Sequence, residues 1–414
     1  MRIAFLSWRD LTHPEGGGAE RYAQTVCAGL AAGGHDVTFL CAAHQDAPAD
    51  EILDGYRILR AGSRTSVYPQ AFRRLRALER ADGPFDAVVD VQNGLPFASP
   101  LATRTPVIVL SHHVHREQWP VVFNPAIART GWFLESRVAP RLYRGRQYVT
   151  VSCRSRDEMV GLGIDGGAIS VIHNGTDLPT RSSGPRSADP TVVVLGRLVP
   201  HKRVEAAVDA VHALRHRVPG LRLRVIGAGY WHDEIAAHAE AVGAADIVDL
   251  LGYVDEATKH RELAAAWVSL APSLKEGWGL NVVEAAAHGV PTVAFHGAGG
   301  LSESVQDGVT GLLAHDMDQF VAHTHRLLVD DDLRDEMGEA SLLHAARFSW
   351  EETIDRWEHL LAYVAGGGAP LAEIDRDLRR GGATPVGAHR APHRHVGHRR
   401  SHRSSRPTQE HVHA

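Results

Sequence analysis

The sequence predicts an α/β protein with two consecutive parallel-sheet domains. Short, continuous apolar runs, typical of buried parallel strands, alternate with helical segments in the first half of the chain. A polar segment rich in Pro and Ser, residues 179–190, breaks this alternation as a linker would, and the pattern then starts again. The length of 414 residues suits two or three domains. We expect the two sheets to face each other across a cleft at the carboxyl edges of their strands, where open α/β sheets bind ligands.

The first domain is predicted over residues 1–178. Its first strand, residues 3–8, leads into a helix over residues 19–32 that ends at two glycines. A second helix is expected over residues 70–80. Further strands are expected at residues 37–42, 56–60, 85–91, 107–111, 148–152 and 169–173.

The second domain is predicted over residues 191–348, with helices between its strands. Ser349, followed three residues later by Glu352, opens a last helix over residues 349–364 in the manner of a capping box, and we expect this helix to return to the first domain. The tail, residues 366–414, is rich in His and Arg and poor in apolar residues, which predicts disorder; metal binding by its histidines is the alternative. The strands are expected at residues 191–195, 223–227, 248–251, 268–271 and 292–295.

Composition excludes several classes of protein. The net charge of −5 argues against a nucleic-acid partner. Cys27, Cys41 and Cys153 are odd in number and widely spaced, which favours a reducing compartment over a disulfide framework or a metal site. The apolar run at residues 3–8 is too short for a secretory signal, and no stretch approaches a membrane span. We therefore expect a cytoplasmic protein.

Basic residues are almost all arginine, and lysine occurs only at positions 202, 259 and 275. Such a bias is typical of a GC-rich bacterial gene. It draws attention to the lysines that lie beside candidate motifs, although the bias alone assigns no function.

The most informative stretch runs from Glu276 to Glu284. Glu276 ends the loop after a predicted strand, the flexible Gly277 and Gly279 follow, and Glu284 lies in the opening turns of a helix. Exposed N–H groups at a helix start suit a phosphate, and ionised carboxylates accept hydrogen bonds from sugar hydroxyls. The alternative is that the helix dipole alone favours a glutamate at this end.

Two further motifs suit phosphate. Gly16, Gly17 and Gly18 open the first helix and would let a phosphate approach the backbone, unless they form only a tight turn. A dinucleotide fingerprint would need glycine at position 21, where Arg21 stands. The second motif is the turn after strand 191–195, which carries two cations that fit a diphosphate unless they are merely solvated. These cations are Arg197 and Lys202.

Other strand ends complete the predicted site. Gly227 would let a ligand lie close, and the backbone at Tyr253 and Val254 suits recognition of a base. The strand at residues 107–111 ends in His112 and His113, whose imidazoles can donate, accept or shuttle protons near neutral pH. A purely structural histidine is the alternative at either position.

With these motifs in order, residues 1–364 resemble the retaining glycosyltransferases of family 4, which have the GT-B fold. The two glutamates match the family's E-x7-E motif, and the glycine loop and the Gly-Arg…Lys turn have counterparts in it. Residues 171–177 look like its inter-domain segment, and residues 307–313 look like a late glycine turn. The resemblance adds two residues to the predicted donor-binding site: Gly196 from the Gly-Arg…Lys turn and Asn174 from the inter-domain segment.

The resemblance implies a role for each motif. Arg197 and Lys202 would hold the donor diphosphate, and Glu284 would bind the ribose hydroxyls. Glu276 would contact the transferred sugar together with a histidine. Counting along the strand from Pro106 favours His112 for this role over His113. The backbone after Glu276 would contact the sugar and the phosphate, and Trp278 stands where the family more commonly has Phe. That backbone comprises Gly277, Trp278, Gly279, Leu280 and Asn281.

The resemblance also implies the ligands. The donor would be a UDP- or GDP-sugar, the acceptor a sugar, glycan, small molecule or lipid-linked sugar, and no metal or other cofactor is expected. The helix at residues 70–80 and the segment 129–146 are basic and amphipathic, which suits docking on the anionic inner face of a membrane; a solvated face is the alternative. The candidate membrane contacts are Arg73, Arg74, Arg76 and Arg80.

Other functions on this architecture remain open. A sugar-nucleotide epimerase or a non-catalytic sugar-nucleotide binder would show the same donor motifs. A phosphorylase would need a lysine for pyridoxal phosphate. It is disfavoured because the chain has only three lysines and two of them lie beside donor motifs. A dehydrogenase is disfavoured by Arg21 and by the Ala-Ala-His sequence after the second strand, where an acidic residue is expected.

Overall fold

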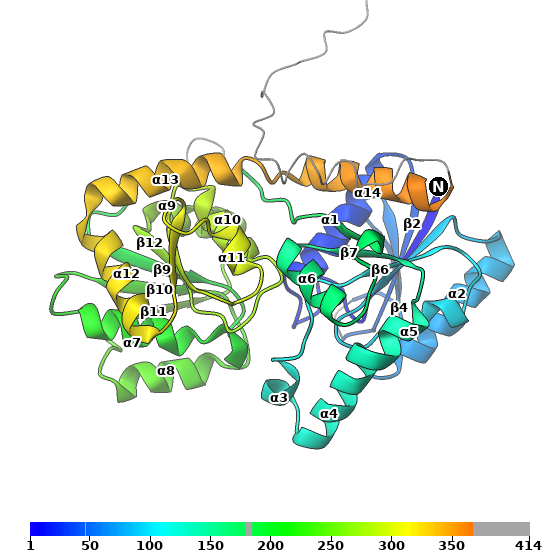
Figure 1. The fold of residues 1–414 in the computed structure, drawn as a ribbon, viewed down its shortest axis with the longest axis horizontal. Helices are drawn as coiled ribbons and strands as arrows, with labels where there is room; N and C mark the ends of the chain where they lie inside the picture. The colour runs from blue at the N-terminus through cyan, green and yellow to red at the C-terminus, as the bar shows by residue number, and fades with distance from the viewer. Residues whose placement is uncertain (46, 179–183, 367–414) are drawn as a thin grey trace, which may run out of the picture.

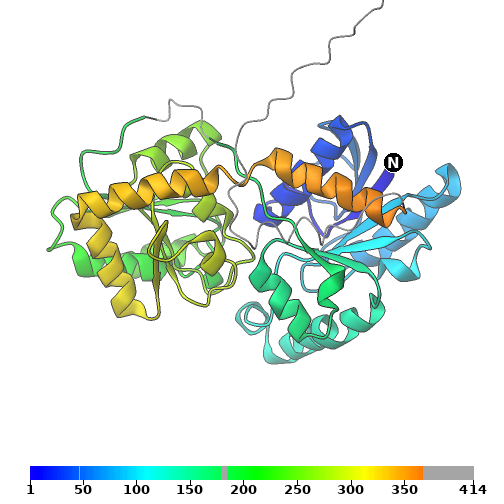
Figure 2. The ribbon, with the colours of Figure 1, turned by 45° about the horizontal axis from the view of Figure 1, so that its top comes forward.

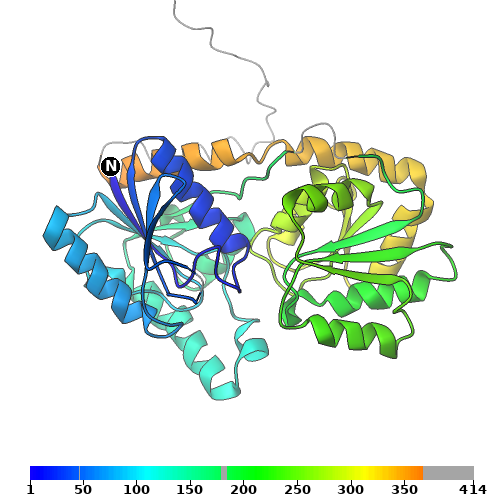
Figure 3. The ribbon, with the colours of Figure 1, turned by 180° about the vertical axis from the view of Figure 1, so that it is seen from behind.

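The computed structural model describes residues 1–45, 47–178 and 184–366. Two α/β units, each built on one sheet, stand side by side and are joined along one edge by C-terminal helices (Figure 1). Figure 3 shows the same two sheets from behind. The prediction of two parallel-sheet domains is therefore confirmed. Residues 179–183 of the predicted linker and the predicted tail from residue 367 onward lie outside the described residues.

The first sheet has eight strands in the order β3-β4-β2-β1-β5-β6-β7-β8. All neighbouring pairs are parallel except β3 and β4, which form an antiparallel hairpin. The sequence pattern did not predict β3, because this four-residue edge strand begins with two acidic residues and alternates between exposed and half-buried positions. The strands are β1 Arg2–Leu6, β2 Asp36–Cys41, β3 Asp50–Leu53, β4 Tyr56–Arg60, β5 Ala87–Val91, β6 Val107–Leu110, β7 Gln147–Thr150 and β8 Ile169–Val171.

Helices cover the first sheet and extend one corner of it. The helix predicted at residues 70–80 is longer on both sides and runs from Val67 to Asp82. Between β6 and β7 the chain forms a helical hairpin that projects away from the body of the domain (Figure 1). The helices are α1 Gly18–Ala32, α2 Val67–Asp82, α3 Trp119–Val122, α4 Pro125–Phe133, a π-helical turn Leu134–Val138, α5 Ala139–Leu142 and α6 Cys153–Gly161.

The second sheet has six parallel strands in the order β11-β10-β9-β12-β13-β14. The strand order reverses between β9 and β12, and ligands bind at such a switch point in open α/β sheets. The loops that follow these two strands carry the predicted Arg197–Lys202 turn and Glu276. The strands are β9 Thr191–Leu195, β10 Arg222–Ile226, β11 Val248–Gly252, β12 Val268–Ala271, β13 Thr292–Phe295 and β14 Gly311–Ala314.

Seven α-helices are described for the second unit, in residues 184–345. The α7 and α12 helices pack against each other. The bounds of the seven are α7 Val204–Leu214, α8 His232–Ala241, α9 Glu256–Ala265, α10 Leu280–Ala286, α11 Leu301–Ser304, α12 Met317–Val329 and α13 Asp331–Ala345.

The last helix, α14 Trp350–Val364, lies against α1 of the first unit (Figure 2). Ser349 caps it by accepting a hydrogen bond from the amide of Glu352 at 3.2 Å. Trp357 is fully buried, and its indole N–H donates to the hydroxyl of Tyr22 at 2.7 Å. Tyr22 in turn donates to the carbonyl of Ile172 at 3.1 Å. The prediction of a helix that returns to the first domain is therefore confirmed.

Candidate active site

Glu276 and Lys202 meet at the switch point of the second sheet. The ammonium of Lys202 donates to Oε1 of Glu276, and the hydroxyl of Ser273 donates to the same oxygen at 2.7 Å. Burial acts to raise the pKa of Glu276, but the charge and hydrogen bond of Lys202 and the bond from Ser273 outweigh it and leave the pKa below its usual value. Glu276 is therefore ionised at neutral pH and can only accept hydrogen bonds.

Arg197 links this site to the glycine loop of the other domain. Its guanidinium donates to the backbone carbonyl of Glu15 at 3.1 Å. A Cβ at Gly17 would lie 2.9 Å from Nε of Arg197, so the loop reaches this distance because residue 17 has no side chain. Burial, followed by the nearby Arg9, lowers the pKa of Arg197, although a guanidinium remains charged at neutral pH. A partly desolvated cation that faces a carbonyl favours the arrival of an anion.

Internal acceptors already occupy part of the glycine loop. Glu20 in the first turn of α1 accepts a hydrogen bond from the amide of Gly17 at 2.9 Å and pairs with Arg9 at 2.8 Å. The amide of Gly16 donates to the carbonyl of His13 at 2.7 Å. A Cβ at Gly18 would lie 4.0 Å from Cδ2 of Leu280 in the second domain. Gly17 and Gly18 thus adjoin the second domain, and Arg197 supplies the cation beside Gly17.

Glu284 is held by two cations, one from each domain. The ammonium of Lys259 donates to its Oε1 at 2.8 Å, and Arg21 of α1 lies 3.5 Å from the same oxygen. Arg21 also bonds the carboxylate of Asp177 and lies 3.7 Å from Glu256. The residue that breaks the dinucleotide fingerprint is therefore an inter-domain ion-pair partner. Sequence reasoning missed both Arg21 and Lys259 in this role, although the scarcity of lysine was a usable signal.

His112 and His113 point to different surroundings. The His112 ring packs edge-on against Tyr22 of α1, with centroids 5.2 Å apart, and burial lowers its pKa to about 4. The His113 ring lies 4.3 Å from that of His115, and burial followed by the charge of His115 lowers its pKa well below the usual value. Both rings are therefore neutral at pH 7 and can donate as well as accept a hydrogen bond.

The loop of the E-x7-E motif touches the first domain directly at His112. A Cβ at Gly277 would lie only 2.5 Å from the carbonyl oxygen of His112. The hydroxyl of Ser155 donates to that same carbonyl at 3.0 Å and lies 3.5 Å from the carbonyl of Gly277. The predicted histidine and the predicted glutamate loop, which come from different domains, are therefore neighbours.

Other predicted site residues differ in how they can reach a ligand. The Trp278 indole packs 4.5 Å from the ring of His173 and 4.9 Å from that of Phe348, so this side chain is part of the packing between elements. The side-chain oxygen of Asn174 is buried and has no hydrogen-bond partner within the described residues. Tyr253 is 86% exposed and free to stack on a base.

Glycines and small turns shape the remaining surface. Gly196 and Gly227 follow β9 and β10, and a Cβ at Gly227 would lie 1.9 Å from the carbonyl of Gly196. Gly279 caps α10 with φ 93°, a left-handed conformation that favours glycine. Asn281 and Val254 are half-buried at the start of α10 and after β11. Gly196, Gly227 and Val254 thus follow strands, and Gly279 and Asn281 lie at the start of a helix, as the sequence predicted.

A further contact between the domains was not predicted. Oε2 of Glu303 in α11 accepts hydrogen bonds from the amides of Cys153 at 2.8 Å and Arg154 at 3.3 Å, at the start of α6. Its other oxygen lies 3.1 Å from Nε2 of His173. Burial acts to raise the pKa of Glu303, but His173 and the two amides outweigh it and leave the pKa lowered.

We expect the Glu303→Gln variant to lose about 1 kcal/mol of unfolding free energy at pH 7, because a charged acceptor is replaced by a neutral one. A carboxyl whose pKa is lowered by folding stabilises the protein above its unfolded value, 4.5, and this contribution is lost as pH falls through the folded value. Urea unfolding at pH 7 and at successively lower pH should therefore show a difference that shrinks on acidification. An equal difference at every pH would contradict this role.

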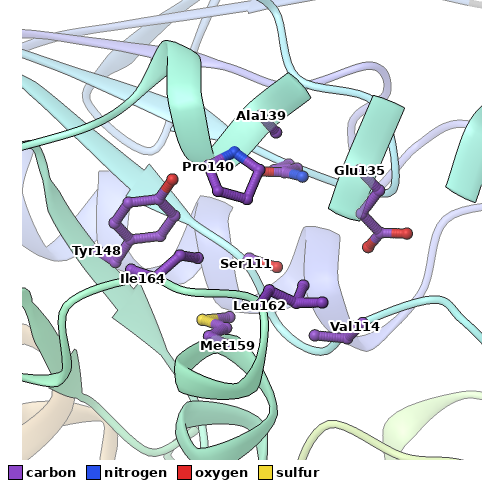
Figure 4. A pocket seen from close by; sticks show the side chains of 10 residues that line it. Ser111, Val114, Glu135, Ala139, Pro140, Tyr148, Met159, Leu162 and Ile164 are labelled. Carbon is purple, nitrogen blue, oxygen red and sulfur yellow. The ribbon is translucent and has the colours of Figure 1, made fainter. Parts of the chain in front are cut away.

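A small cavity lies in the first domain (Figure 4). Its volume is about 20 Å³, and it is lined by Ser111, Tyr148 and Glu135 among others. This is room for about one water molecule. Glu135 accepts a hydrogen bond from the Trp119 indole at 2.7 Å and lies 2.9 Å from His115, so it serves to hold α3. The cavity is too small for a sugar or a nucleotide.

The predicted basic helix is partly tied to its own domain. Arg76 donates to the carbonyls of Leu101 at 2.9 Å and Ala102 at 3.1 Å and lies over the ring of Phe72. Arg73 and Arg80 are exposed, and Arg74 is half-buried. The projecting hairpin instead exposes apolar side chains. These are Val121, Val122, Ile127 and Phe133.

Two kinds of feature are absent from the described residues. Over residues 1–45, 47–178 and 184–366, no helix combines the length and the apolar character that crossing a bilayer requires. In the same ranges, no three His, Cys, Asp or Glu side chains gather closely enough to hold a metal ion.

Two family models match the chain in succession. Residues 16–179 match the model described as Glycosyltransferase Family 4, and residues 179–343 match that of Glycosyl transferases group 1. The D-inositol 3-phosphate glycosyltransferase of Thermobifida fusca is 32% identical over 208 residues, which are 45% of this chain and 48% of the relative. The GDP-mannose-dependent alpha-(1-6)-phosphatidylinositol monomannoside mannosyltransferase of Mycobacterium tuberculosis is 35% identical over 187 residues, 42% of this chain and 46% of the relative.

The match thus spans about half the length of these curated relatives. Among solved structures, the sucrose-phosphate synthase of Thermosynechococcus elongatus has the same fold, with a TM-score of 0.75 and 20% identity over 92% of this chain and 100% of that one. The two family models together run from residue 16 to residue 343 and cover both sheets. The chain belongs to glycosyltransferase family 4 and has the GT-B fold.

Proposed function

We propose that the chain is a retaining glycosyltransferase that moves a hexose from a UDP- or GDP-sugar to a sugar, glycan, small-molecule or lipid-linked acceptor. One observation carries this proposal. Arg197 and Lys202, from one turn, meet Glu276, from the E-x7-E motif, at the switch point of the second sheet, and Arg197 adjoins the glycine loop of the first domain. Two cations and a carboxylate in this arrangement suit a diphosphate and the sugar attached to it.

In this proposal, the cations stabilise the leaving group. As the bond from the anomeric carbon to the diphosphate oxygen breaks, negative charge grows on the diphosphate beside Arg197 and Lys202. The acceptor hydroxyl attacks the same face of the sugar, and its proton passes to the leaving phosphate oxygen. This front-face substitution retains the anomeric configuration without a protein nucleophile. No added metal is needed, and activity should persist in excess EDTA.

The remaining residues would orient the donor. Glu276 accepts hydrogen bonds only, so it suits sugar hydroxyls, and the neutral ring of His112 can donate to or accept from the same sugar. Glu284 would accept from the ribose hydroxyls while it stays paired with Lys259. Tyr253 would stack on the base, and the buried amide of Asn174 would offer its unpartnered oxygen to the ligand.

A panel of nucleotide sugars tests this function. Binding to the native state raises the melting temperature by mass action, so the correct donor should give the largest shift. Slow hydrolysis of that donor, or transfer to an added acceptor with retained configuration, would then support a transferase. A changed sugar nucleotide without any acceptor would show an epimerase instead. Binding without hydrolysis or transfer would show a non-catalytic binder.

We also propose that the protein is cytoplasmic and docks on an anionic membrane through the α3–α4 hairpin. The hairpin exposes Ile127 and Phe133, at 49% and 58% of their surface, and segment 129–146 adds arginines. An apolar patch beside basic residues suits anionic lipid. The exposed Arg73 and Arg80 of α2 would add charge on the same domain.

We expect the wild-type protein to co-sediment with anionic vesicles at low salt, and the Ile127→Asp/Phe133→Asp variant to lose most of this binding. Leu343→Asp is the matched control, because Leu343 is 76% exposed on α13 of the other domain. No sedimentation of the wild type, or equal sedimentation of all three proteins, would end the proposal of membrane docking.

A further inference from the structure

A second hollow lies at the carboxyl edge of the second sheet, on the side of β13 and β14. Its volume is about 310 Å³, enough for a group much larger than water. The loops after β12, β13 and β14 and the start of α7 form its walls. The residues that matter here are Arg203, Ser273, Phe295, His296, His315 and Asp316.

The rim of this hollow is basic. The Arg203 guanidinium lies 4.9 Å above the ring of Phe295, and this side chain is exposed. In the part of the chain that the structure describes, Arg203 forms no ion pair. The exposed rings of His296 and His315 stack on each other at 4.8 Å with an interplanar angle of 23°. A guanidinium and two imidazoles thus face a space of ligand size.

The hollow also contains one acidic residue, Asp316. Its carboxylate caps α12 by accepting a hydrogen bond from the amide of Gln319 at 2.9 Å, so one of its oxygens is engaged by its own helix. The amide of His315 donates to the side chain of Gln319 at 3.1 Å, which fixes the start of this loop. The hollow therefore presents the basic side chains of Arg203, His296 and His315 to a bound anion, and one carboxylate that is hydrogen-bonded to its own helix.

The backbone at Arg203 adds to this preference. Arg203 has φ 52° and ψ 41°, a left-handed conformation that is costly for a residue other than glycine or asparagine. It is the N-cap of the eleven-residue helix α7, and no side-chain hydrogen bond caps that end. The positive end of the α7 dipole therefore adjoins the guanidinium. Backbone strain at residues other than glycine is concentrated at functional sites.

The hollow and the donor site share two loops. Lys202 and Ser273 both donate to Glu276, which we assign to the transferred sugar. Arg203 directly follows Lys202, but its guanidinium lies over the ring of Phe295 in the hollow. Ser273 also lines the hollow. A group bound in the hollow would therefore lie beside the transferred sugar without taking the place of the donor diphosphate.

We propose that this hollow binds a phosphomonoester, held by Arg203, His296 and His315. The phosphate could belong to the acceptor of the reaction or to a separate small molecule. The first source rests on the proposed transferase function, whereas the anion affinity of the hollow does not. Planar guanidinium groups and imidazole N–H donors match phosphate oxygens in both cases.

Titration of the full chain with inorganic phosphate, followed by calorimetry, tests the site. Arg203→Asn removes the charge and keeps a residue that tolerates the left-handed conformation. We expect this variant, and separately His296→Ala/His315→Ala, to weaken phosphate binding about tenfold or more, the loss of one charge-assisted contact. Arg217→Asn is the control, because Arg217 is an exposed arginine after α7 and outside the hollow. The proposal would be overturned if the wild-type protein bound no inorganic phosphate at millimolar concentrations, or if Arg217→Asn weakened phosphate binding as much as Arg203→Asn.

Two further arms separate the phosphate sources and the proposed function. Inositol 3-phosphate and glucose 6-phosphate are titrated in the presence of the nucleotide sugar that gives the largest thermal shift. If the phosphate belongs to the acceptor, one of these two compounds becomes glycosylated. If the phosphate belongs to a separate small molecule, the compounds bind but are not consumed. Loss of phosphate binding in Arg203→Asn with an unchanged donor shift supports the hollow, whereas absence of any donor shift bears on the proposed function alone.

Discussion

Replacing Arg197 by alanine is expected to lower kcat/KM about 100- to 1000-fold, the range seen when one preorganised donor to a developing anion is lost. Lys202→Ala should have an effect of similar size. In the proposed function both cations face the leaving diphosphate, and Arg197 is a half-buried guanidinium that donates to the carbonyl of Glu15. Because its charge is partly desolvated, a diphosphate would gain more from it than from a cation in water.

The two variants should differ in their side effects. Lys202→Ala removes the cation that holds the pKa of Glu276 below its usual value, so the carboxyl of this variant should need a higher pH to ionise and the acid limb of its pH–rate profile should move up. Arg197→Lys keeps the charge but loses the planar fork, and we expect it to recover only part of the activity. Steady-state kinetics with the donor identified by thermal shift measures all three. Arg217→Ala is the control for loss of an arginine, and near-normal kinetics in both alanine variants would refute the assignment.

The fold was predictable where the strands are buried and regular. Residues 191–195, 268–271 and 292–295 read as continuous apolar runs, and all three are central strands of the second sheet. Strand β14 was missed because its sequence, Gly-Leu-Leu-Ala, is short and directly follows a glycine turn. Strand β3 was missed because a half-exposed edge strand does not carry a continuous apolar signal.

The proximity of Arg197, Lys202 and Glu276 was predictable for the same reason. Motifs placed after parallel strands must come to one edge of a sheet. The pairing of Arg21 with Glu284 and the bonds of Glu303 were not predictable, because docking of two domains creates them and leaves no local pattern. The same holds for the hollow beside Arg203, whose histidines come from two different loops.

Gly277→Ala is expected to lower kcat/KM about 100-fold, because a misplacement of about 1 Å between reacting groups costs this much. A methyl group at this position would lie 2.5 Å from the carbonyl oxygen of His112 and 3.3 Å from a methyl of Val151. The nearest atom belongs to the backbone of the other domain, so the domains themselves must move apart. We also expect a loss of about 1–3 kcal/mol in unfolding free energy, as for other overpacked sites.

This variant separates donor binding from domain closure. Arg197, Lys202 and Glu284 stay in the second domain, so the thermal shift with the donor should largely persist while transfer fails, because His112 and the glycine loop no longer reach the sugar and the phosphates. Gly161→Ala is the matched control: its new methyl meets no atom within 4 Å, and φ at this helical position is ordinary. Urea unfolding and steady-state kinetics of both variants give the comparison. Wild-type kinetics in Gly277→Ala would mean that catalysis does not need the two domains at the separation seen here, and that the contact between His112 and the glutamate loop is incidental to the reaction.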